Sequence, residues 1–106
     1  MTRETPTPSL LQLSRELQQI NAAYRFDGKN YFIWSQLNQT IFKGKGKISH
    51  IIGTGPKKED TAYAAWDKED SMIIAWLWSS MAPEINDTYM FLSTAKEVWE
   101  SIQQTY

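Results

Sequence analysis

The sequence predicts a single all-α domain, a compact bundle of about five helices. Apolar residues recur at helical spacing in most of the chain, and no stretch alternates apolar and polar residues for long enough to indicate a strand. Five tryptophans, five tyrosines and four phenylalanines provide the bulk of a packed core. The length of 106 residues fits one domain and leaves little room for a second.

The helical domain is expected over residues 9–106, after a flexible tail formed by residues 1–8 with their two prolines. Ser9 lies three residues before Gln12, which is the spacing of a capping box. The first helix then carries one narrow apolar stripe, formed by Leu10, Leu13, Leu17 and Ile20. We expect this stripe to pack on its own domain, and a contact with a partner or another subunit is the alternative.

A turn and a second helix follow. Segment 26–30 contains Asp27-Gly28, a common turn pair, and Asn30 is a favourable N-cap. The apolar positions of the helix are Tyr31, Trp34, Leu37 and Ile41. We expect this helix to end near Gly44, because two glycines interrupt the lysines of segment 43–47. A short apolar piece over 48–52 and a loop over 53–56 come next.

The third helix is expected to start at Asp60, a possible N-cap, and to run to about Ser80. Its segment 72–78 is apolar on every face, so we expect the central helix of the fold, buried on most sides. Pro83 suits the first turn of a short fourth helix over 83–90.

The last helix has the clearest amphipathic pattern. Thr94 and Glu97 have the spacing of a second capping box. The apolar positions that follow lie on one face of a helix: Ala95, Val98, Trp99, Ile102 and Tyr106.

Composition excludes several classes of function. The formal net charge of −1 gives no overall field that would attract nucleic acid or an anionic membrane. The chain has no cysteine, which excludes disulfides and Cys-ligated zinc and favours an intracellular setting. The longest apolar run, 72–78, is far shorter than the roughly 20 residues of a membrane-spanning helix.

The titratable residues indicate no catalytic or metal site. The single histidine, His50, lacks the sequence partners of a catalytic triad or a His-based zinc site, so a packed or surface histidine is expected. Several lysines are interspersed among the neighbouring acids, which predicts a solvated face with local ion pairs. These acids are Glu59, Asp60, Asp67, Glu69 and Asp70. The residues themselves therefore predict no enzyme, no cofactor and no metal.

A lysine-rich loop is the one candidate for phosphate contact. Lys43, Lys45 and Lys47 alternate with two glycines, but the spacing and the preceding helix do not fit a P-loop. A solvated loop is expected, and contact with phosphate is the weaker alternative. The tryptophans at helical spacing predict core packing rather than a platform for stacking bases. They are Trp34, Trp66, Trp76 and Trp99.

Five short motifs occur in order between residues 24 and 106. They are Phe26-Asp27-Gly28-Lys29-Asn30-Tyr31 with Trp34; Gly44-Lys45-Gly46 with Ile51-Ile52-Gly53; Trp66 with Asp70 and Trp76-Leu77; Met81, Pro83 and Ile85; and Thr94-Ala95-Lys96-Glu97-Val98-Trp99. In this order and spacing, they resemble the N-terminal part of the capsid region of the copia-type LTR retrotransposon Gag polyprotein.

The resemblance implies a helical fold like that of a retroviral or retrotransposon capsid N-terminal domain, and a structural role without enzymatic activity. Such Gag proteins self-assemble into a cytoplasmic virus-like particle that encloses the RNA and replication enzymes of the element. The chain's partner would then be itself, although this fragment alone could stay monomeric. The resemblance also implies that the motif residues are mostly core: Phe26, Gly28, Asn30, Tyr31, Trp34, Trp66, Trp76, Leu77, Ala95 and Trp99.

The chain also departs from the family pattern. Family members continue into a second helical part and often carry a Cys/His zinc knuckle for RNA, whereas this chain ends at Tyr106 and has no cysteine. We therefore expect the N-terminal part of a longer Gag protein, or a truncated or domesticated copy, without nucleic-acid binding by this fragment. The alternative function is a domesticated scaffold or peptide-binding module that acts as a monomer.

Overall fold

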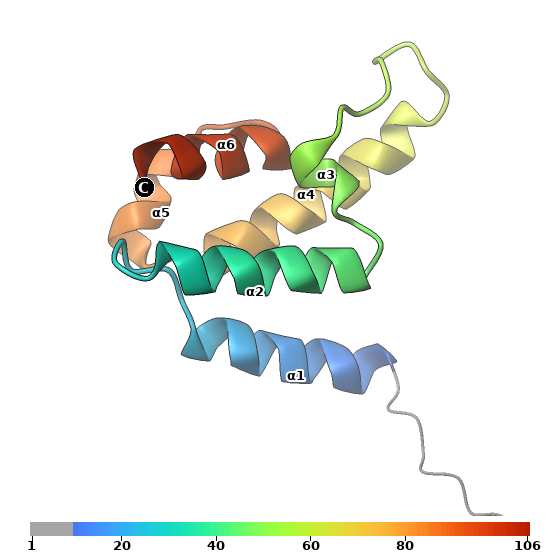
Figure 1. The fold of residues 1–106 in the computed structure, drawn as a ribbon. Coiled ribbons are helices and arrows are strands. Elements are labelled where there is room, and N and C mark those ends of the chain that lie inside the picture. The colour runs from blue at the N-terminus through green and yellow to red at the C-terminus, as the bar shows by residue number, and fades with distance from the viewer. Residues whose placement is uncertain (1–9) are drawn as a thin grey trace, which may run out of the picture.

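The computed structural model describes residues 10–106 and, of their side chains, those from residue 15 onward (Figure 1). Six helices form this part of the chain: α1 (Leu10–Ala23), α2 (Tyr31–Gly44), α3 (Ser49–Ile52), α4 (Tyr63–Ser79), α5 (Pro83–Tyr89) and α6 (Ala95–Thr105). The prediction of an all-helical fold is confirmed for these residues. The additional helix is α3, because the short apolar piece after α2 forms a single helical turn. The tail predicted over residues 1–8 lies outside the described residues.

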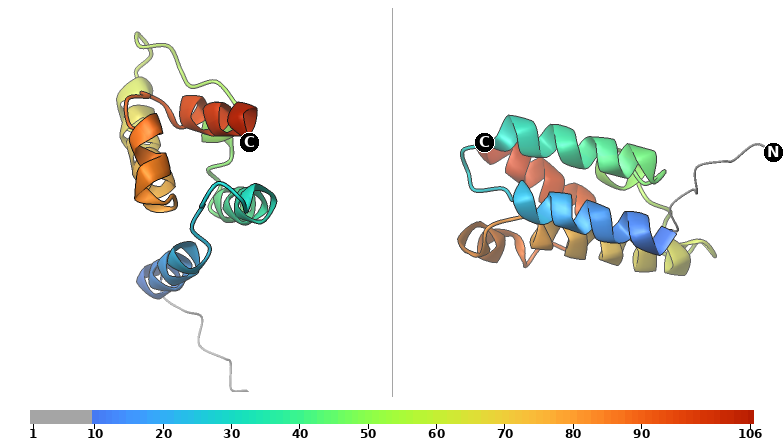
Figure 2. Two further views of the ribbon diagram at one scale, coloured as in Figure 1. Left: turned by 90° about the vertical axis from the view of Figure 1, so that its left-hand side faces the viewer. Right: turned by 90° about the horizontal axis from the view of Figure 1, so that it is seen from below.

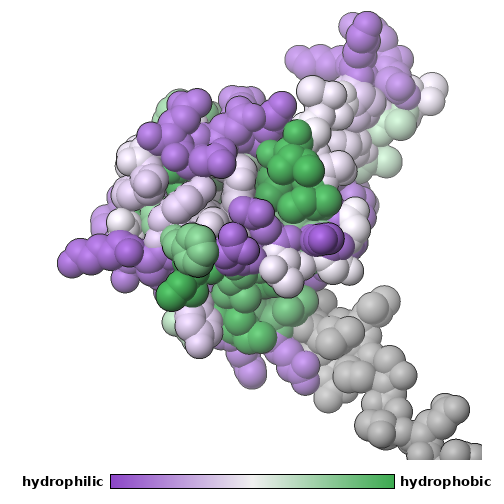
Figure 3. Space-filling model, viewed as in Figure 1, coloured by the Kyte–Doolittle hydropathy of each residue, from purple (hydrophilic) through white to green (hydrophobic). Residues whose placement is uncertain are grey.

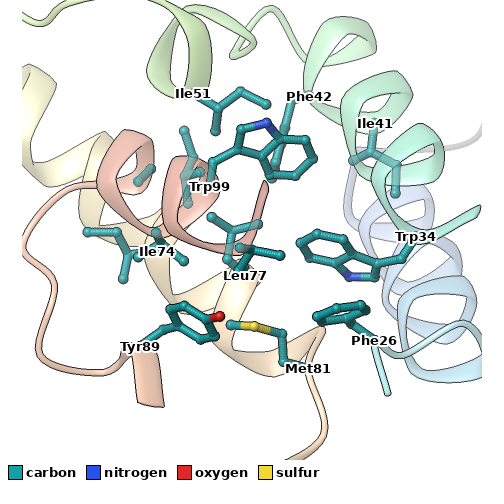
Figure 4. Close-up of a cluster of buried hydrophobic side chains, with 14 residues drawn as sticks. Phe26, Trp34, Ile41, Phe42, Ile51, Ile74, Leu77, Met81, Tyr89 and Trp99 are labelled. Atoms are coloured by element: carbon teal, nitrogen blue, oxygen red, sulfur yellow. The ribbon is translucent and has the colours of Figure 1, made fainter. Parts of the chain in front are cut away.

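The helices surround one core. Helix α6 packs against α3 and α4, and α2 closes the core from the other side (Figures 1 and 4). Helix α1 lies beneath α2 and α4, as the views in Figure 2 show. The buried apolar side chains come from the elements after α1: Phe26, Trp34, Ile41, Phe42, Ile51, Ile73, Ile74, Leu77, Met81, Tyr89, Ala95, Val98, Trp99 and Ile102.

A column of aromatic rings joins the two ends of the domain. The ring of Trp34 stacks on Phe26, with centroids 4.9 Å apart, and on Trp99, with centroids 5.3 Å apart. Figure 4 shows Trp34 between these two rings. Tyr106 meets Phe26 edge-on at 4.8 Å. Aromatic pairs at these separations add about 0.5–1.5 kcal/mol each beyond their buried area, so the column fastens α2 to α6.

The connection between α1 and α2 is fixed to the connection between α4 and α5. The N–H of Phe26 donates to the carbonyl of Ser80 at 2.7 Å, and the N–H of Ala82 donates to the carbonyl of Phe26 at 2.8 Å. This pairing forms a single parallel β-bridge between Phe26 and Met81, the one extended pairing in residues 10–106. It holds Phe26 in place at the base of the aromatic column.

The expected caps are partly wrong. Asn30 precedes α2, but its side chain binds the preceding turn, accepting from the N–H of Asp27 at 3.0 Å and donating to the carbonyl of Arg25 at 3.0 Å. Asp60 does not cap the third helix, because it accepts from the N–H of Ala62 within a turn and α4 begins only at Tyr63. Short polar side chains such as Asn and Asp can bond the backbone of a turn as well as the first N–H groups of a helix. At Asn30 and Asp60 the bonds within the turn form instead of the helix cap.

The capping box expected at Thr94 and Glu97 is present in part, because Glu97 bonds the hydroxyl of Thr94 rather than its backbone N–H. The hydroxyl oxygen of Thr94 accepts from the N–H of Glu97 at 3.1 Å. The carboxylate of Glu97 accepts from the hydroxyls of Ser93 and Thr94, at 3.0 and 3.1 Å. The Thr94 hydroxyl thus satisfies a backbone N–H that has no partner within the helix, and the cap fixes where α6 begins.

Helix α4 is buried on one side only, which corrects the expectation for segment 72–78. Ile73, Ile74 and Leu77 face the core, whereas 70% of Met72 is exposed. Trp76 is partly buried at the edge of the same outward face. A helix that is apolar on all faces is usually buried on all of them. The exposed face of α4 is therefore a candidate for contact with another molecule. Within the described residues, no helix is both long enough and apolar enough to cross a membrane.

Candidate functional site

Two features that involve α4 could serve a function: a buried histidine with its carboxylates, and a groove beside α1. The histidine is His50 on α3, and only 4% of it is exposed. Its Nδ1 lies 2.8 Å from Oδ1 of Asp70, and its Nε2 lies 3.1 Å from Oε1 of Glu69. The indole of Trp66 covers the imidazole face with a centroid separation of 5.3 Å. Both ring nitrogens thus face carboxylate oxygens, and only the doubly protonated ring donates to both.

Asp70 links three helices. It extends from α4, is 1% exposed, and places its Oδ1 against His50 of α3. Its Oδ2 accepts from the backbone N–H of Ala95 at 3.1 Å. Ala95 is the first residue of α6, where unpaired N–H groups and the helix dipole favour a negative charge. The carboxylate therefore fixes how α3, α4 and α6 meet.

Lys47 closes the outer end of this network. Its Nζ lies 2.7 Å from Oε1 of Glu69. The hydrogen bond from Lys47 holds the pKa of the Glu69 carboxyl below its ordinary value, and the contact with His50 acts in the same direction against the effect of burial. Both side chains of this pair are more than one-third exposed, so the ion pair itself contributes little to stability.

The network is suited to holding helices together rather than to chemistry. A general base needs a ring nitrogen free to take a proton, and both nitrogens of His50 already have carboxylate partners. No group of three or more His, Cys, Asp or Glu side chains in the described part of the chain is arranged to hold a metal ion. We interpret the buried pair of His50 and Asp70, with Glu69 at its exposed end, as a structural link.

The groove lies between α4 and α1, and one end of it reaches the Lys47–Glu69 pair at the outer end of the histidine network. One hollow of about 360 Å³ is lined from α4 by Met72, Ala75, Trp76 and Ser79, and from α1 and its end by Gln18, Asn21, Ala22 and Arg25. A second hollow of about 270 Å³ shares Gln18, Met72 and Trp76 with it and extends to Lys45, Lys47 and Glu69. Because the two share a wall, we treat them as one feature, the α1–α4 groove. The larger hollow, of about 360 Å³, is at the lower end of the roughly 300–1,000 Å³ typical of ligand sites.

Trp76 lines both hollows of the α1–α4 groove and is held by two side chains from α2 and its C-terminal end. Its Nε1–H donates to Oδ1 of the buried Asn38 at 2.9 Å. The Nζ of Lys45 lies 5.0 Å from the centre of a Trp76 ring, in a cation–π contact. Asn21 donates to the hydroxyl of Ser79 at 3.3 Å across the groove, which ties α1 to α4. The groove is therefore a preformed apolar surface with cations at its edge.

The residues singled out by the family motif do not form one site. Five are buried in the core: Phe26, Trp34, Leu77, Ala95 and Trp99. Tyr31 and Trp76 are partly buried and pack against it. Gly28 and Asn30 shape the turn before α2, and Trp66 lies apart from the core, stacked on His50.

The other predicted candidates are dispersed. Leu17 packs against the core, whereas the side chains of Leu10 and Leu13 lie outside the described residues. Lys43 is exposed at the end of α2. Lys45 and Lys47 already have partners, in Trp76 and Glu69. The structure therefore does not gather the three lysines into a phosphate cradle.

The sequence interpretation missed two residues, Asp70 and Met72. Asp70 was grouped with solvated acids, but it precedes Ile73, Ile74 and Leu77 at the spacing of one helix face. That spacing was a usable signal that this carboxylate is buried. Met72 gave no such signal, because its segment is apolar on every face.

Comparisons with family models, with curated proteins and with solved structures give no match for this chain. The likeness to Gag capsid regions thus rests on the sequence motifs alone.

Proposed function

We propose that this chain is a structural capsid domain of the copia-type Gag class, which contributes to a particle by associating with copies of itself. The aromatic column is the observation that carries the proposal. Phe26, Trp34 and Trp99 come from motifs at both ends of the resemblance, and they stack in one continuous set. The motif residues thus act together as the core of one fold, as expected when a motif specifies a scaffold rather than a reactive site.

The character of the surface supports the same role. Both ring nitrogens of His50 are bonded to carboxylates, so this cluster of titratable side chains connects helices rather than offering a free base. Large apolar side chains are exposed at several places, and among them Met72 on α4 is 70% and Phe91 after α5 is 80% exposed. Exposed apolar side chains of this size favour contacts between proteins. Weak contacts repeated many times are sufficient for a shell, because their effects multiply.

The test is self-association of the folded chain. We expect the mean mass by light scattering and sedimentation to rise with protein concentration, and electron microscopy at high concentration to show regular shells, tubes or sheets. A chain that stays monomeric across salt and concentration would contradict the proposal.

The second candidate function is a monomeric scaffold or peptide-binding module, and the α1–α4 groove favours it. Its hollow of about 360 Å³ and its apolar floor at Met72 and Trp76 could receive a peptide side chain. Saturable binding of a peptide by a persistent monomer would select this function over assembly.

A further inference from the structure

The turn after α5 exposes two large apolar side chains next to each other. Met90 is 49% exposed and Phe91 is 80% exposed. The turn is closed by a hydrogen bond from the N–H of Leu92 to the carbonyl of Tyr89, at 3.3 Å. We name Met90 and Phe91 the apolar knob. A phenylalanine displayed to this extent on a turn is a good anchor for a complementary hollow.

Acidic side chains occur on the two helices that flank the apolar knob. Glu84 and Asp87 are exposed on α5, which leads into the turn. Glu97 lies in the first turn of α6, where its carboxylate accepts from the hydroxyl of Ser93. The nearby Lys96 lies 3.7 Å from Glu100, one turn further along α6, so its charge is directed away from the knob.

The α1–α4 groove has the opposite charge. Arg25 lines one end of it, and Lys45 and Lys47 line the other. The one acid in its wall, Glu69, is bonded to Lys47 at 2.7 Å. The groove therefore presents an apolar floor with a net positive rim, and the knob presents an apolar tip with a negative rim. Complementary rims of this kind select a partner and orient it.

The knob and the groove lie on opposite sides of the domain. In Figure 1, α1 runs along the bottom and the segment between α5 and α6 passes across the top, and the left view of Figure 2 separates them in the same way. One copy cannot place its own knob in its own groove. A second copy can, and each contact then leaves one knob and one groove free to continue.

We propose that the apolar knob of one copy docks in the α1–α4 groove of the next, with Phe91 against Met72 and Trp76. This inference rests on the proposed function, since it names the contact by which copies associate. The contact is heterologous, so it produces rings or open rows rather than closed dimers. It is small and partly electrostatic, so a single contact is weak and is weakened further by salt.

The first test compares two exposed phenylalanines by sedimentation of the complete chain. Phe91→Ala should weaken association at least roughly tenfold, because the anchor loses most of its buried apolar area. Phe32→Ala is the matched control, since Phe32 is 74% exposed on α2, away from the knob and the groove. It should associate like the wild type. On the face drawn in Figure 3, hydrophobic residues also gather over α3 and where α1 meets α2, so Ile52→Ala on α3 serves as a second control.

The second test uses the groove. Met72→Glu should abolish association, whereas Ser71→Glu, which adds the same charge to α4 outside the groove lining, should not. Both positions are exposed, so circular dichroism should show unchanged helix content. Mixing the Phe91→Ala and Met72→Glu chains is decisive. Alone, the first should associate weakly and the second not at all. Because the first has an intact groove and the second an intact knob, the mixture should form a one-to-one complex more readily than either variant associates with itself.

The outcomes separate the two proposals. A wild type that associates while Phe91→Ala and Met72→Glu associate equally well overturns this contact and leaves the proposed function standing. A mixture that stays monomeric although each variant is folded also overturns it, because the contact would then not be heterologous. A wild type that is monomeric at every concentration overturns both.

Discussion

The imidazole of His50 and the carboxylate of Asp70 form a buried pair, with Nδ1 and Oδ1 only 2.8 Å apart. Burying two such groups costs solvation free energy, so the pair by itself adds little net stability. The pair instead fixes the positions of helices, because the second oxygen of Asp70 accepts from the N–H of Ala95 at the start of α6. Moving α3 or α6 away from α4 would separate Asp70 from His50 or from the N–H of Ala95.

Asp70→Ala should lower the free energy of unfolding by about 3–5 kcal/mol, because it leaves the buried Nδ1 of His50 and the buried N–H of Ala95 without their shared partner. The measurement is urea unfolding followed by circular dichroism. Asp67→Ala, an exposed aspartate on the same helix, is the control and should change stability by less than about 0.5 kcal/mol. A double-mutant cycle with His50→Ala should give a coupling of at least about 1 kcal/mol. Additive effects would show that the two residues act independently.

Glu69 should make stability depend on pH in the acid range. Its pKa is held below the ordinary 4.5, chiefly by the hydrogen bond from Lys47. The unfolded chain therefore takes up a proton on Glu69 before the folded chain does. The stabilisation is present above about pH 4.5 and is lost as the pH falls through the lowered pKa.

The check is thermal unfolding as a function of pH. Glu69→Gln should give a shallower loss of melting temperature below this pH than the wild type. Lys47→Met should have the same effect, since it removes the hydrogen bond that lowers the pKa. Identical acid profiles for the wild type and both variants would contradict the assignment.

Two glycines should respond in opposite ways to alanine. Gly28 has φ +91°, a conformation that side-chain-bearing residues rarely adopt, although a Cβ there would make only ordinary contacts, 3.6 Å from Ile85 and from Tyr106. Gly28→Ala should therefore destabilise the domain by about 1–2 kcal/mol. Gly44 ends α2, and a Cβ there would have no neighbour within 4 Å.

Gly44→Ala should thus be neutral or stabilising, by up to about 1 kcal/mol. Both variants are compared by denaturant unfolding at the same pH. Equal effects at the two positions would show that the turn before α2 tolerates a side chain at Gly28.

The sequence predicts local helices well because their signals are local. The spacing of Ala95, Val98, Trp99 and Ile102 indicates both α6 and its buried face, and all four are buried. Glycines and prolines likewise indicate where α2 ends and α5 begins.

The candidate surfaces were harder to predict because they depend on distant partners. Burial of Asp70 depends on His50, twenty residues away along the chain. Exposure of Met72 depends on how closely α1 approaches α4, and a segment that is apolar all round does not indicate which side is left open. Sequence periodicity thus fixes the faces of a helix but not what covers each face.

Helix α1 poses the remaining choice between a lid and a subunit contact, and Leu17 decides it. Leu17 is partly buried and packs against the core, so Leu17→Ala should lower the free energy of unfolding by about 1–2 kcal/mol and speed hydrogen exchange in α1. Gln19→Ala, an exposed neighbour, is the control. If Leu17→Ala instead leaves stability and exchange unchanged but reduces association, α1 is a subunit contact. If both properties change, the loosened helix has also deformed the α1–α4 groove, because Gln18 and Asn21 of α1 form one of its walls.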